Sequence, residues 1–457
     1  MPFTKADVSI IGLGKVGSST LAAMASRGIK AIGVDVLETS VAALERGKAP
    51  VEETDLQATL TAHSANYRVT TDYEDAVRNS DISIVLVPTP SDERGAFSIQ
   101  YAARAFSSIG KALRGKTGYH LVVLASTVLP GATRQGLLPM LEKESGKICG
   151  IDFGLCYNPK LIALGSVIHD VLNPDLSILG EFDARSGDIM EGLLKRFFLN
   201  NAPIKRMSIE NAELAKVAIA CFVTFKISYA NMLASFCEHL PNADVDTISD
   251  AIGADSRIGR KCLTGGLGFG GPCFPRDTVA LSFMGKELHV DTSIVEACTT
   301  FNNIHSASLL SRLTGKIPES GTAAVLGLSY KPFSHVTEDS IAIALCRALQ
   351  KNGYEVGGYD PLAGPSAKQE LGHGYTVHDT LEDCLRNAEI VFIATDDPQF
   401  RALTPDHFPR RDGKTYVIDF WRCLNPAIAE APAIEYLPAG RSIGGNDEEL
   451  LAKLWQI

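Results

Sequence analysis

A glycine-rich turn between a short strand and a helix is the feature that most constrains this 457-residue chain. Val8-Ser9-Ile10-Ile11 reads as a buried strand, residues 16–26 read as a helix, and Gly12-Leu13-Gly14-Lys15-Val16-Gly17 joins them. The first glycine permits a tight turn, the second lets backbone approach a pyrophosphate, and the third lets the helix pack closely on the strand. The pattern indicates a Rossmann-type unit that binds a dinucleotide.

Asp35 supplies the acid that such a unit needs. It ends the second expected strand, residues 31–34, at about the 20-residue spacing from the glycines that a ribose-binding acid requires. Its carboxylate can accept hydrogen bonds from a ribose 2′-OH and would repel a 2′-phosphate, and no arginine follows closely to neutralise that phosphate. The motif therefore predicts NAD rather than NADP. A glycine-rich turn without a ligand is the alternative, which the strand, helix and acid together disfavour.

Short Val/Ile/Leu runs alternate with helical patterns in both the first and the last part of the chain. The later runs stand at residues 81–87, 120–124, 323–328, 355–359, 390–394 and 416–420. Such runs suit strands buried on both faces of a parallel sheet, and their alternation with helices implies right-handed βαβ units. Between the two parts, residues 210–240 favour a long helix without glycine or proline.

The sequence thus predicts an α/β fold with two Rossmann-like doubly wound domains bridged by a central helical segment. We expect an N-terminal NAD-binding domain at residues 1–200, a central helical domain with a cysteine-bearing loop at 201–315, and a C-terminal α/β domain at 316–457. The second α/β part has no comparable glycine fingerprint.

Charge and composition exclude several classes of partner. The net charge of −10 disfavours nucleic acid and anionic membranes. The most apolar stretch, residues 217–236, contains Lys226, so it reads as a buried helix rather than a membrane span. The N-terminus lacks the layout of a signal peptide, and ten cysteines without a C-x-x-C pair indicate reduced thiols in the cytoplasm. The ten histidines show no ligand spacing, so no metal is predicted.

A second glycine-rich segment, residues 265–271, precedes Cys273 and Asp277. So many glycines suggest backbone that comes close to a ligand. A thiol there could act as a covalent nucleophile if cations stabilise its thiolate. A small buried hydrophobe is the alternative for a single cysteine, and the residues alone leave both readings open.

An ordered series of motifs resembles the UDP-glucose/UDP-N-acetylmannosamine dehydrogenase family, the NAD-dependent nucleotide-sugar 6-dehydrogenases. Besides the glycine turn with Asp35, the series contains Gly47-x-x-Pro50-x-x-Glu53-x-x-Leu56, Val87-Pro88-Thr89-Pro90, Ser126-Thr127-Val128-x-Pro130-Gly131-x-Thr133, Asn158-Pro159, Ala212-Glu213-Leu214-x-Lys216, Asp255-x-Arg257-Ile258-Gly259, Gly268-Phe269-Gly270-Gly271-x-Cys273 with Asp277, and Gly327-Leu328-Ser329-Tyr330-Lys331-Pro332. The resemblance covers nearly the whole chain.

This resemblance implies oxidation of the primary alcohol of a nucleotide sugar, a UDP-sugar in the first place, to a carboxylate with two NAD reduced. It implies that Cys273 forms a thiohemiacetal and then a thioester, that Lys216 stabilises oxyanion charge, and that Asp277 positions or activates water. It further places Thr127 near the nicotinamide and Thr89 along the dinucleotide, and makes the C-terminal domain the nucleotide-sugar-binding domain. The other substrate-binding residues that it implies are Lys216, Arg257, Phe269, Gly270, Lys331 and Arg422.

The chain departs from the family pattern at several charged or polar positions. Lys160 and Leu164 stand where the family has glutamates, and Ala220 stands where it has an asparagine. In the C-terminal part, Glu338 replaces an arginine, and His335 and Val336 replace a pair of acids. We expect Lys160 to bind substrate phosphate or carboxylate charge, with Asp277 and water left to carry hydrolysis. A lysine there acts as a neutral base only if burial or nearby cations lower its pKa by about three units.

Structural roles compete with these assignments. Lys216 could extend its ammonium to solvent, Asp277 could cap a helix, and Arg257 and Lys331 could be surface cations. The long helix at 210–240 suggests a homodimer interface, although it could equally be internal core. Two other functions stay open: a two-electron dehydrogenase of another phosphorylated or nucleotide alcohol, and a catalytically silent paralogue that binds nucleotides.

Overall fold

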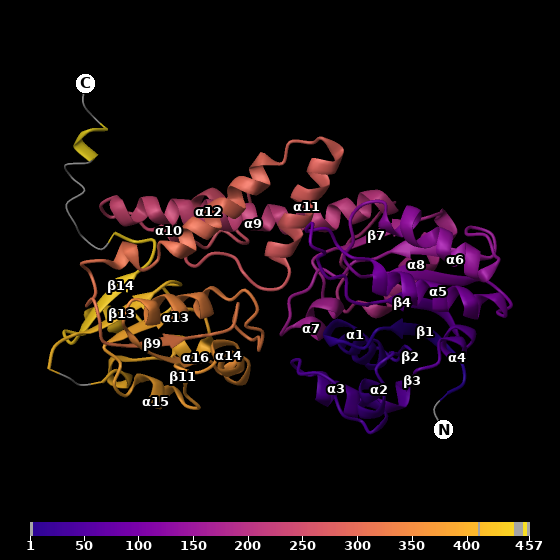
Figure 1. Ribbon diagram of the computed structural model, residues 1–457, viewed down its shortest axis with the longest axis horizontal. Coiled ribbons are helices and arrows are strands. Elements are labelled where there is room, and N and C mark those ends of the chain that lie inside the picture. The colour runs from indigo at the N-terminus through magenta and orange to yellow at the C-terminus, as the bar shows by residue number, and fades with distance from the viewer. Residues whose placement is uncertain (1–2, 410–411, 443–450, 455–457) are drawn as a thin grey trace. The chain divides into compact units, whose positions relative to one another are not determined.

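The computed structural model describes residues 3–409, 412–442 and 451–454, and Figure 1 shows its helices and strands. The chain folds into two compact units. Unit 1 comprises Met1–Ile219 with Val279–Asp291, and unit 2 comprises Ala220–Thr278 with Thr292–Ile457. Two helices, α9 (Ile209–His239) and α11 (Phe274–Leu288), contribute residues to both units. Residues of the expected central domain are therefore divided between the units.

Unit 1 is built on an eight-stranded sheet in the order β3-β2-β1-β4-β5-β6-β7-β8, whose first six strands follow the Rossmann order. Neighbouring strands run parallel except β6 and β7. The strands are β1 (Ala6–Ile11), β2 (Ala31–Val34), β3 (Tyr67–Thr70), β4 (Ser80–Val85), β5 (His120–Leu124), β6 (Phe153–Tyr157), β7 (Ser177–Glu181) and β8 (Ile204–Ser208). Residues such as Ile10 and Ile11 are both fully buried because helices cover each face.

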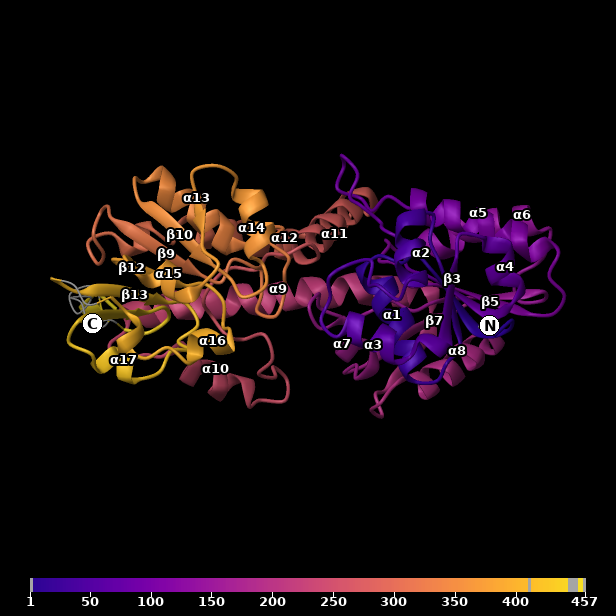
Figure 2. The same ribbon diagram turned by 90° about the horizontal axis from the view of Figure 1, so that it is seen from below.

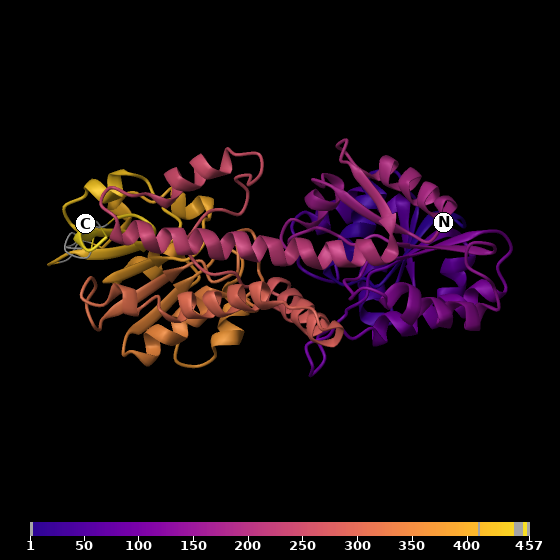
Figure 3. The ribbon, with the colours of Figure 1, turned by 90° about the horizontal axis from the view of Figure 1, so that it is seen from above.

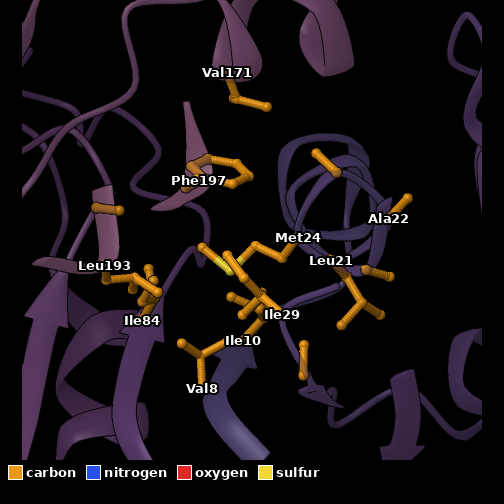
Figure 4. Packing of buried hydrophobic residues seen from close by; sticks show 14 of the residues in the cluster. Val8, Ile10, Leu21, Ala22, Met24, Ile29, Ile84, Val171, Leu193 and Phe197 are labelled. Atoms are coloured by element: carbon orange, nitrogen blue, oxygen red, sulfur yellow. The ribbon is translucent and has the colours of Figure 1, made fainter. Parts of the chain in front are cut away.

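Two clusters of apolar side chains fill the two faces of this sheet. One cluster packs β1 and β4 against α1 (Lys15–Ser26), α2 (Glu38–Glu45), α3 (Leu56–Ala62), α7 (Val167–Leu172) and α8 (Ala184–Phe197). Figure 4 shows its centre, where Ile10 from β1, Met24 from α1 and Phe197 from α8 converge. The other cluster packs against α4 (Tyr73–Arg78), α5 (Gln100–Arg114) and α6 (Leu138–Ser145). Alternate residues of each strand supply the two clusters.

Unit 2 repeats the same strand order in a six-stranded parallel sheet, β11-β10-β9-β12-β13-β14. Its strands are β9 (Thr322–Leu326), β10 (Glu355–Tyr359), β11 (Thr376–Val377), β12 (Ile390–Ile393), β13 (Thr415–Asp419) and β14 (Ile434–Pro438). Figure 2 shows α13 (Ile341–Lys351) and α14 (Gly364–Leu371) on one side of it, and α16 (Pro398–Arg401) and α17 (Ala427–Glu430) on the other, where α15 (Leu381–Leu385) also packs. The expected pair of Rossmann-like domains is confirmed.

The helical segment between the sheets consists of α9, α10 (Val245–Gly253), α11 and α12 (Ser293–Ala307). Figure 3 shows α9 as one continuous helix. By length and composition α9 could cross a membrane, but its most apolar window is 44% buried in protein. Lys226 in that window donates to the backbone carbonyl of Gly259 (2.7 Å), and Glu213 and Asn231 are buried and hydrogen-bonded. These contacts fit a helix that packs within a folded protein.

Candidate active site

The turn between β1 and α1 has the geometry that a bound pyrophosphate requires. Gly12 has a φ of +96°, and a Cβ there would lie 2.5 Å from the carbonyl oxygen of Leu86. A Cβ on Gly17 would overlap the carbonyl of Gly12. Around the position of a Cβ on Gly14, by contrast, no atom of the described residues lies within 4 Å, apart from those of its own chain neighbours. Two glycines thus close the turn, and the third leaves open space at the N-terminus of α1, beside the backbone of Lys15 and Val16.

Asp35 follows β2 and points back to this turn. Its Oδ2 accepts a hydrogen bond from the backbone amide of Leu13 (2.6 Å), and its Oδ1 accepts one from the amide of Leu37 (2.8 Å). Burial, and secondarily the charge of Asp35, raises the pKa of Tyr73 to about 12. The turn, the helix N-terminus and this oriented carboxylate fit the diphosphate and ribose of NAD.

The loops that follow β4 and β5 are joined by side-chain hydrogen bonds. The hydroxyl of Thr89 donates to the carbonyl oxygen of Thr127 (2.7 Å). The hydroxyl of Ser126 donates to the carbonyl oxygen of Val87 (2.7 Å). Both loops leave the carboxyl edge of the sheet, where nucleotides bind in Rossmann folds. The two threonines that the resemblance assigns to the cofactor therefore belong to one cross-linked substructure of unit 1.

Glu213 is a site residue to which the sequence reasoning gave no role. It lies in the first turns of α9 and is fully buried, and its carboxylate accepts hydrogen bonds from the amides of Gly131 (2.6 Å) and Thr133 (2.9 Å). These amides begin η2 (Ala132–Leu137), directly after the loop that carries Thr127. Burial raises the pKa of Glu213. The residue appears in a quoted motif, but its partners lie 80 and 82 residues away, so the sequence could not show this contact.

Unit 1 also contains the two lysines assigned to the substrate. Lys216 lies one turn beyond Glu213 on α9 and is partly buried. Lys160 lies in the loop after β6, where its Nζ donates to Oδ1 of Asn158 (2.8 Å). Glu53 holds the continuation of that loop, because its Oε1 accepts from the amides of Gly165 (2.7 Å) and Val167 (3.2 Å).

Cys273 and Asp277 lie at the beginning of α11 in unit 2. Cys273 is exposed and directly precedes the helix, whose positive N-terminal dipole favours a thiolate. Asp277 is fully buried inside the first turn, 3.5 Å from the guanidinium of Arg276. Because α11 begins at Phe274, Asp277 is not the helix N-cap that the sequence left open.

The glycines before Cys273 face protein rather than open space. A Cβ on Gly266 would lie 2.6 Å from the carbonyl oxygen of Phe420, and one on Gly268 would overlap the side chain of Asn302. A Cβ on Gly270 would overlap the carbonyl oxygen of Asp339. Neighbouring protein atoms thus explain why these three positions have no side chain. The approach of this backbone to a ligand stays a prediction.

Two buried asparagines hold this loop in place. Asn231 of α9 accepts from the amide of Gly266 (2.7 Å), and Asn302 of α12 accepts from the amide of Phe269 (2.8 Å) and donates to its carbonyl (3.0 Å). His305 contacts the carbonyl of Gly266 through Nε2 (2.7 Å). Phe269 is itself buried, so the loop that leads to Cys273 is anchored by α9 and α12.

The remaining predicted substrate residues differ in their surroundings. Arg257 is 86% exposed and pairs with Asp255 (2.6 Å), and Lys331 lies in the loop after β9. The side chain of Arg422 is fully buried, and its guanidinium donates to both carboxylate oxygens of Asp246 (2.7 and 3.0 Å). It also donates to the carbonyls of Phe420, Ala439, Thr264 and Gly265. The expectation that Arg422 contacts substrate is corrected, because its donors are engaged within the protein and support the start of the Cys273 loop.

Comparison with known families covers all three parts of the chain. Residues 6–198 match the NAD binding domain of the UDP-glucose/GDP-mannose dehydrogenase family, residues 210–304 match its central domain, and residues 324–426 match its UDP binding domain. The chain belongs to the UDP-glucose/GDP-mannose dehydrogenase family.

Individual relatives in this family agree with that assignment. The UDP-glucose 6-dehydrogenase of Haloferax volcanii is 34% identical over 412 residues, covering 89% of this chain and 95% of that protein. The GDP-mannose 6-dehydrogenase of Pseudomonas putida is 31% identical, covering 87% and 92%. The structure of a UDP-glucose dehydrogenase from Pyrobaculum islandicum superposes with a TM-score of 0.84 at 29% identity, covering 96% and 98%.

The family resemblance drawn from the motifs is therefore confirmed, together with an NAD-dependent dehydrogenase acting on the CH–OH group of a nucleotide sugar. NAD as the cofactor is confirmed by the matched domain, in which the glycine turn and Asp35 lie. The roles of individual side chains in this family member stay predictions.

Proposed function

We propose that this family member oxidises the C6 primary alcohol of a nucleotide sugar to the carboxylate through a thioester on Cys273. UDP-sugars are the favoured class of substrate. The observation that supports it most is the setting of Cys273. Among the ten cysteines only Cys262 and Cys273 are exposed, and Cys273 alone of these two adjoins the N-terminus of a long helix. Although Cys262 is exposed as a residue, desolvation of its thiol by surrounding atoms raises its pKa, and burial raises the pKa of Cys149. Both effects disfavour a thiolate.

The chemistry of the proposal balances in four steps. Two NAD molecules, bound one after the other, would each accept one hydride and so supply the two two-electron oxidations. The alcohol becomes an aldehyde, the thiolate of Cys273 adds to it, the resulting thiohemiacetal is oxidised to a thioester, and water releases the acid and the thiol. The ammonium of Lys216 stabilises the oxyanion, and Asp277 positions the water. Thr127 lies along the nicotinamide side, while Arg257, Phe269, Gly270 and Lys331 contribute to sugar-nucleotide binding.

The number of NADH molecules formed for each substrate consumed tests this proposal. UDP-glucose, UDP-N-acetylmannosamine and GDP-mannose are each incubated with NAD, absorbance reports NADH, and mass spectrometry identifies the product. We expect two NADH and a uronic acid. One NADH with an aldehyde product would instead support the two-electron dehydrogenase, and no NADH with any of them would support the silent paralogue.

We further propose a cytoplasmic homodimer. All ten cysteines lie within the described residues and none forms a disulfide, as a reducing compartment favours. The part of α9 in unit 2 exposes a stripe of aromatic residues with helical spacing, Phe222, Phe225, Tyr229 and Phe236. An aromatic stripe of this kind is typical of a surface that packs against another chain.

A further inference from the structure

Lys160 stands at the carboxyl edge of the unit 1 sheet, next to the loop that carries Thr127. Strands β5 and β6 pair in parallel with Leu124 opposite Tyr157, the last residue of each strand. Thr127 and Lys160 each follow these residues by three positions. Because parallel strands deliver their following loops to one edge, the backbone brings the lysine beside the loop assigned to the nicotinamide.

The ammonium end of Lys160 is oriented by a fixed acceptor. Asn158 is 1% exposed, and its amide nitrogen donates to the hydroxyl of Ser177 (3.0 Å) and to the carbonyl of Ile178 (2.7 Å). Both N–H groups of the Asn158 side chain therefore donate to residues of β7. Its Oδ1 accepts a hydrogen bond from Nζ of Lys160 (2.8 Å). This hydrogen bond exists whether the lysine is an ammonium or a neutral amine, so the amine keeps its place when it loses a proton.

The electrostatic surroundings of Lys160 favour loss of that proton. Burial removes the charged end from water and lowers the pKa of Lys160 to about 8. The acids of the neighbouring segments are engaged elsewhere: Glu53 accepts from the amide of Gly165, and Asp170 accepts from the amide of Ala163 and the hydroxyl of Ser166. Among the described residues no carboxylate forms an ion pair with Lys160 that would hold it protonated. The sequence alone did not show this burial.

We propose that Lys160 is the catalytic base that removes the hydroxyl proton when the substrate alcohol is oxidised. This rests on the proposed function. The neutral amine accepts the hydroxyl proton and becomes an ammonium, the carbonyl π bond forms from the O–H electron pair, and the C–H electron pair leaves as hydride to NAD. Because Lys160 is only partly buried, the proton then passes from the ammonium to solvent and the amine is restored. Asn158 is the positioning residue for this transfer.

The inference replaces the expectation that Lys160 serves mainly to bind anionic charge. The two roles make opposite demands on the side chain, since anion binding needs a permanent cation and proton abstraction needs a neutral amine. An arginine remains protonated throughout the accessible pH range and can still donate to Asn158. Lys160→Arg therefore separates the two roles.

The test measures kcat/KM against pH for the wild type, Lys160→Arg, Lys160→Met and Lys160→Glu, with whichever of UDP-glucose, UDP-N-acetylmannosamine and GDP-mannose the wild type oxidises. We expect wild-type activity to rise with pH to a plateau above about 8, and a loss of about 100-fold to 10,000-fold in the Arg and Met variants. In Lys160→Glu the rise should move to lower pH, because a carboxyl group titrates below the amine even where burial raises its pKa above the ordinary value of about 4.3. Lys195→Met, which removes a 67% exposed lysine of α8, should match the wild type.

A readout independent of turnover accompanies the kinetics. The ¹³Cε signal of Lys160, assigned by its loss in Lys160→Met, is titrated by NMR in the full chain, and we expect a midpoint near 8. NAD affinity of each variant, measured by fluorescence, identifies any variant that has merely failed to fold.

A Lys160→Arg variant that binds NAD and keeps wild-type kcat would overturn the inference and leave the proposed function intact. A Lys160 midpoint near 10.4 would do the same. Absence of NADH from the wild type with all three nucleotide sugars would overturn the proposed function itself, and the inference with it.

Discussion

Asp35 is held in a fixed position beside the glycine turn, because both carboxylate oxygens accept backbone hydrogen bonds. We predict that Asp35→Asn reduces the preference for NAD over NADP by about 1–3 kcal/mol. The amide loses one acceptor toward the ribose hydroxyls and removes the charge that repels a 2′-phosphate. The measurement is kcat/KM with each cofactor.

A matched variant separates this effect from a general change in charge. Asp81→Asn removes a 58% exposed carboxylate that pairs only on the surface with Lys5 (3.4 Å), and it should leave the cofactor preference unchanged. An unaltered preference in Asp35→Asn would mean that another residue reads the ribose.

Cys273 allows a second test at the residue scale. We predict that Cys273→Ser abolishes complete oxidation but leaves NAD binding intact, since the cofactor turn belongs to unit 1 and Cys273 to unit 2. A serine hydroxyl ionises far less readily than a thiol and is a poorer leaving group, so an ester would persist. Mass spectrometry of the intact variant after incubation with substrate and NAD should detect it. Turnover at the wild-type rate would exclude covalent catalysis.

Local motifs could be predicted from the sequence, and contacts between distant segments could not. The glycine turn and Asp35 belong to one strand-helix-strand unit, β1-α1-β2, so their spacing alone located them. The engagement of Arg422 with Asp246 spans 176 residues and fills donors that the resemblance had assigned to substrate. The crowding around Gly268 by Asn302 likewise depends on how α12 packs, which no local pattern encodes.

At the scale of elements, a buried polar network links three strands of the unit 1 sheet. Lys116 donates to the carbonyl of Val77 (2.6 Å). Nδ1 of His120 contacts both Nζ of Lys116 (2.9 Å) and the carbonyl oxygen of Ser80 (3.2 Å). His120 Nε2 contacts the hydroxyl of Ser83 (2.9 Å), which contacts that of Ser9 (2.7 Å). Burial first, and Lys116 second, holds the pKa of His120 well below its ordinary value.

This depressed pKa predicts a loss of stability in acid. Below about pH 6.5 the unfolded chain binds a proton at His120 that the folded unit does not, so the free energy of unfolding falls as pH falls. Between pH 7.5 and 5.5 the loss should be about 1.4 kcal/mol. Hydrogen exchange of peptides from β1, β4 and β5 measures it, with His120→Gln as the variant that lacks the titrating group. Equal losses in both proteins would contradict the assignment.

Arg422 joins α10, the loop before Cys273 and the ends of β13 and β14 in unit 2. We predict that Arg422→Met destabilises unit 2 by about 3 kcal/mol, because it removes the buried partner of Asp246 and the donors to several carbonyls. Thermal unfolding followed by fluorescence of Trp421 measures this loss. Arg257→Met, which removes an 86% exposed arginine, is the control and should unfold like the wild type. If Arg422→Met unfolded at the wild-type temperature but had a raised KM for substrate, Arg422 would contact substrate after all.

At the scale of the whole molecule, the alternation of apolar runs and helices was sufficient to predict two doubly wound sheets. Each run became a strand because helices cover both faces, as the fully buried β5 shows. The division of the chain was harder to predict, since α9 and α11 each contribute to both units. The sequence pattern of a helix predicts its length, but it does not show which hydrophobic core each part of the helix packs against.

The aromatic stripe on α9 gives a prediction for the assembled protein. Phe222 and Phe236 are 61% and 58% exposed, and the rings of Phe225 and Tyr229 stack between them at 6.1 Å. Burying such rings on association is favourable at about 25 cal/mol per Å², and a charge in their midst would have to be desolvated. We predict that light scattering gives twice 49.0 kDa for the wild type and 49.0 kDa for Phe222→Glu/Phe236→Glu. Ile151→Glu, at a 67% exposed position in unit 1, should remain a dimer. A monomeric wild type at micromolar concentration would show that the stripe serves another purpose.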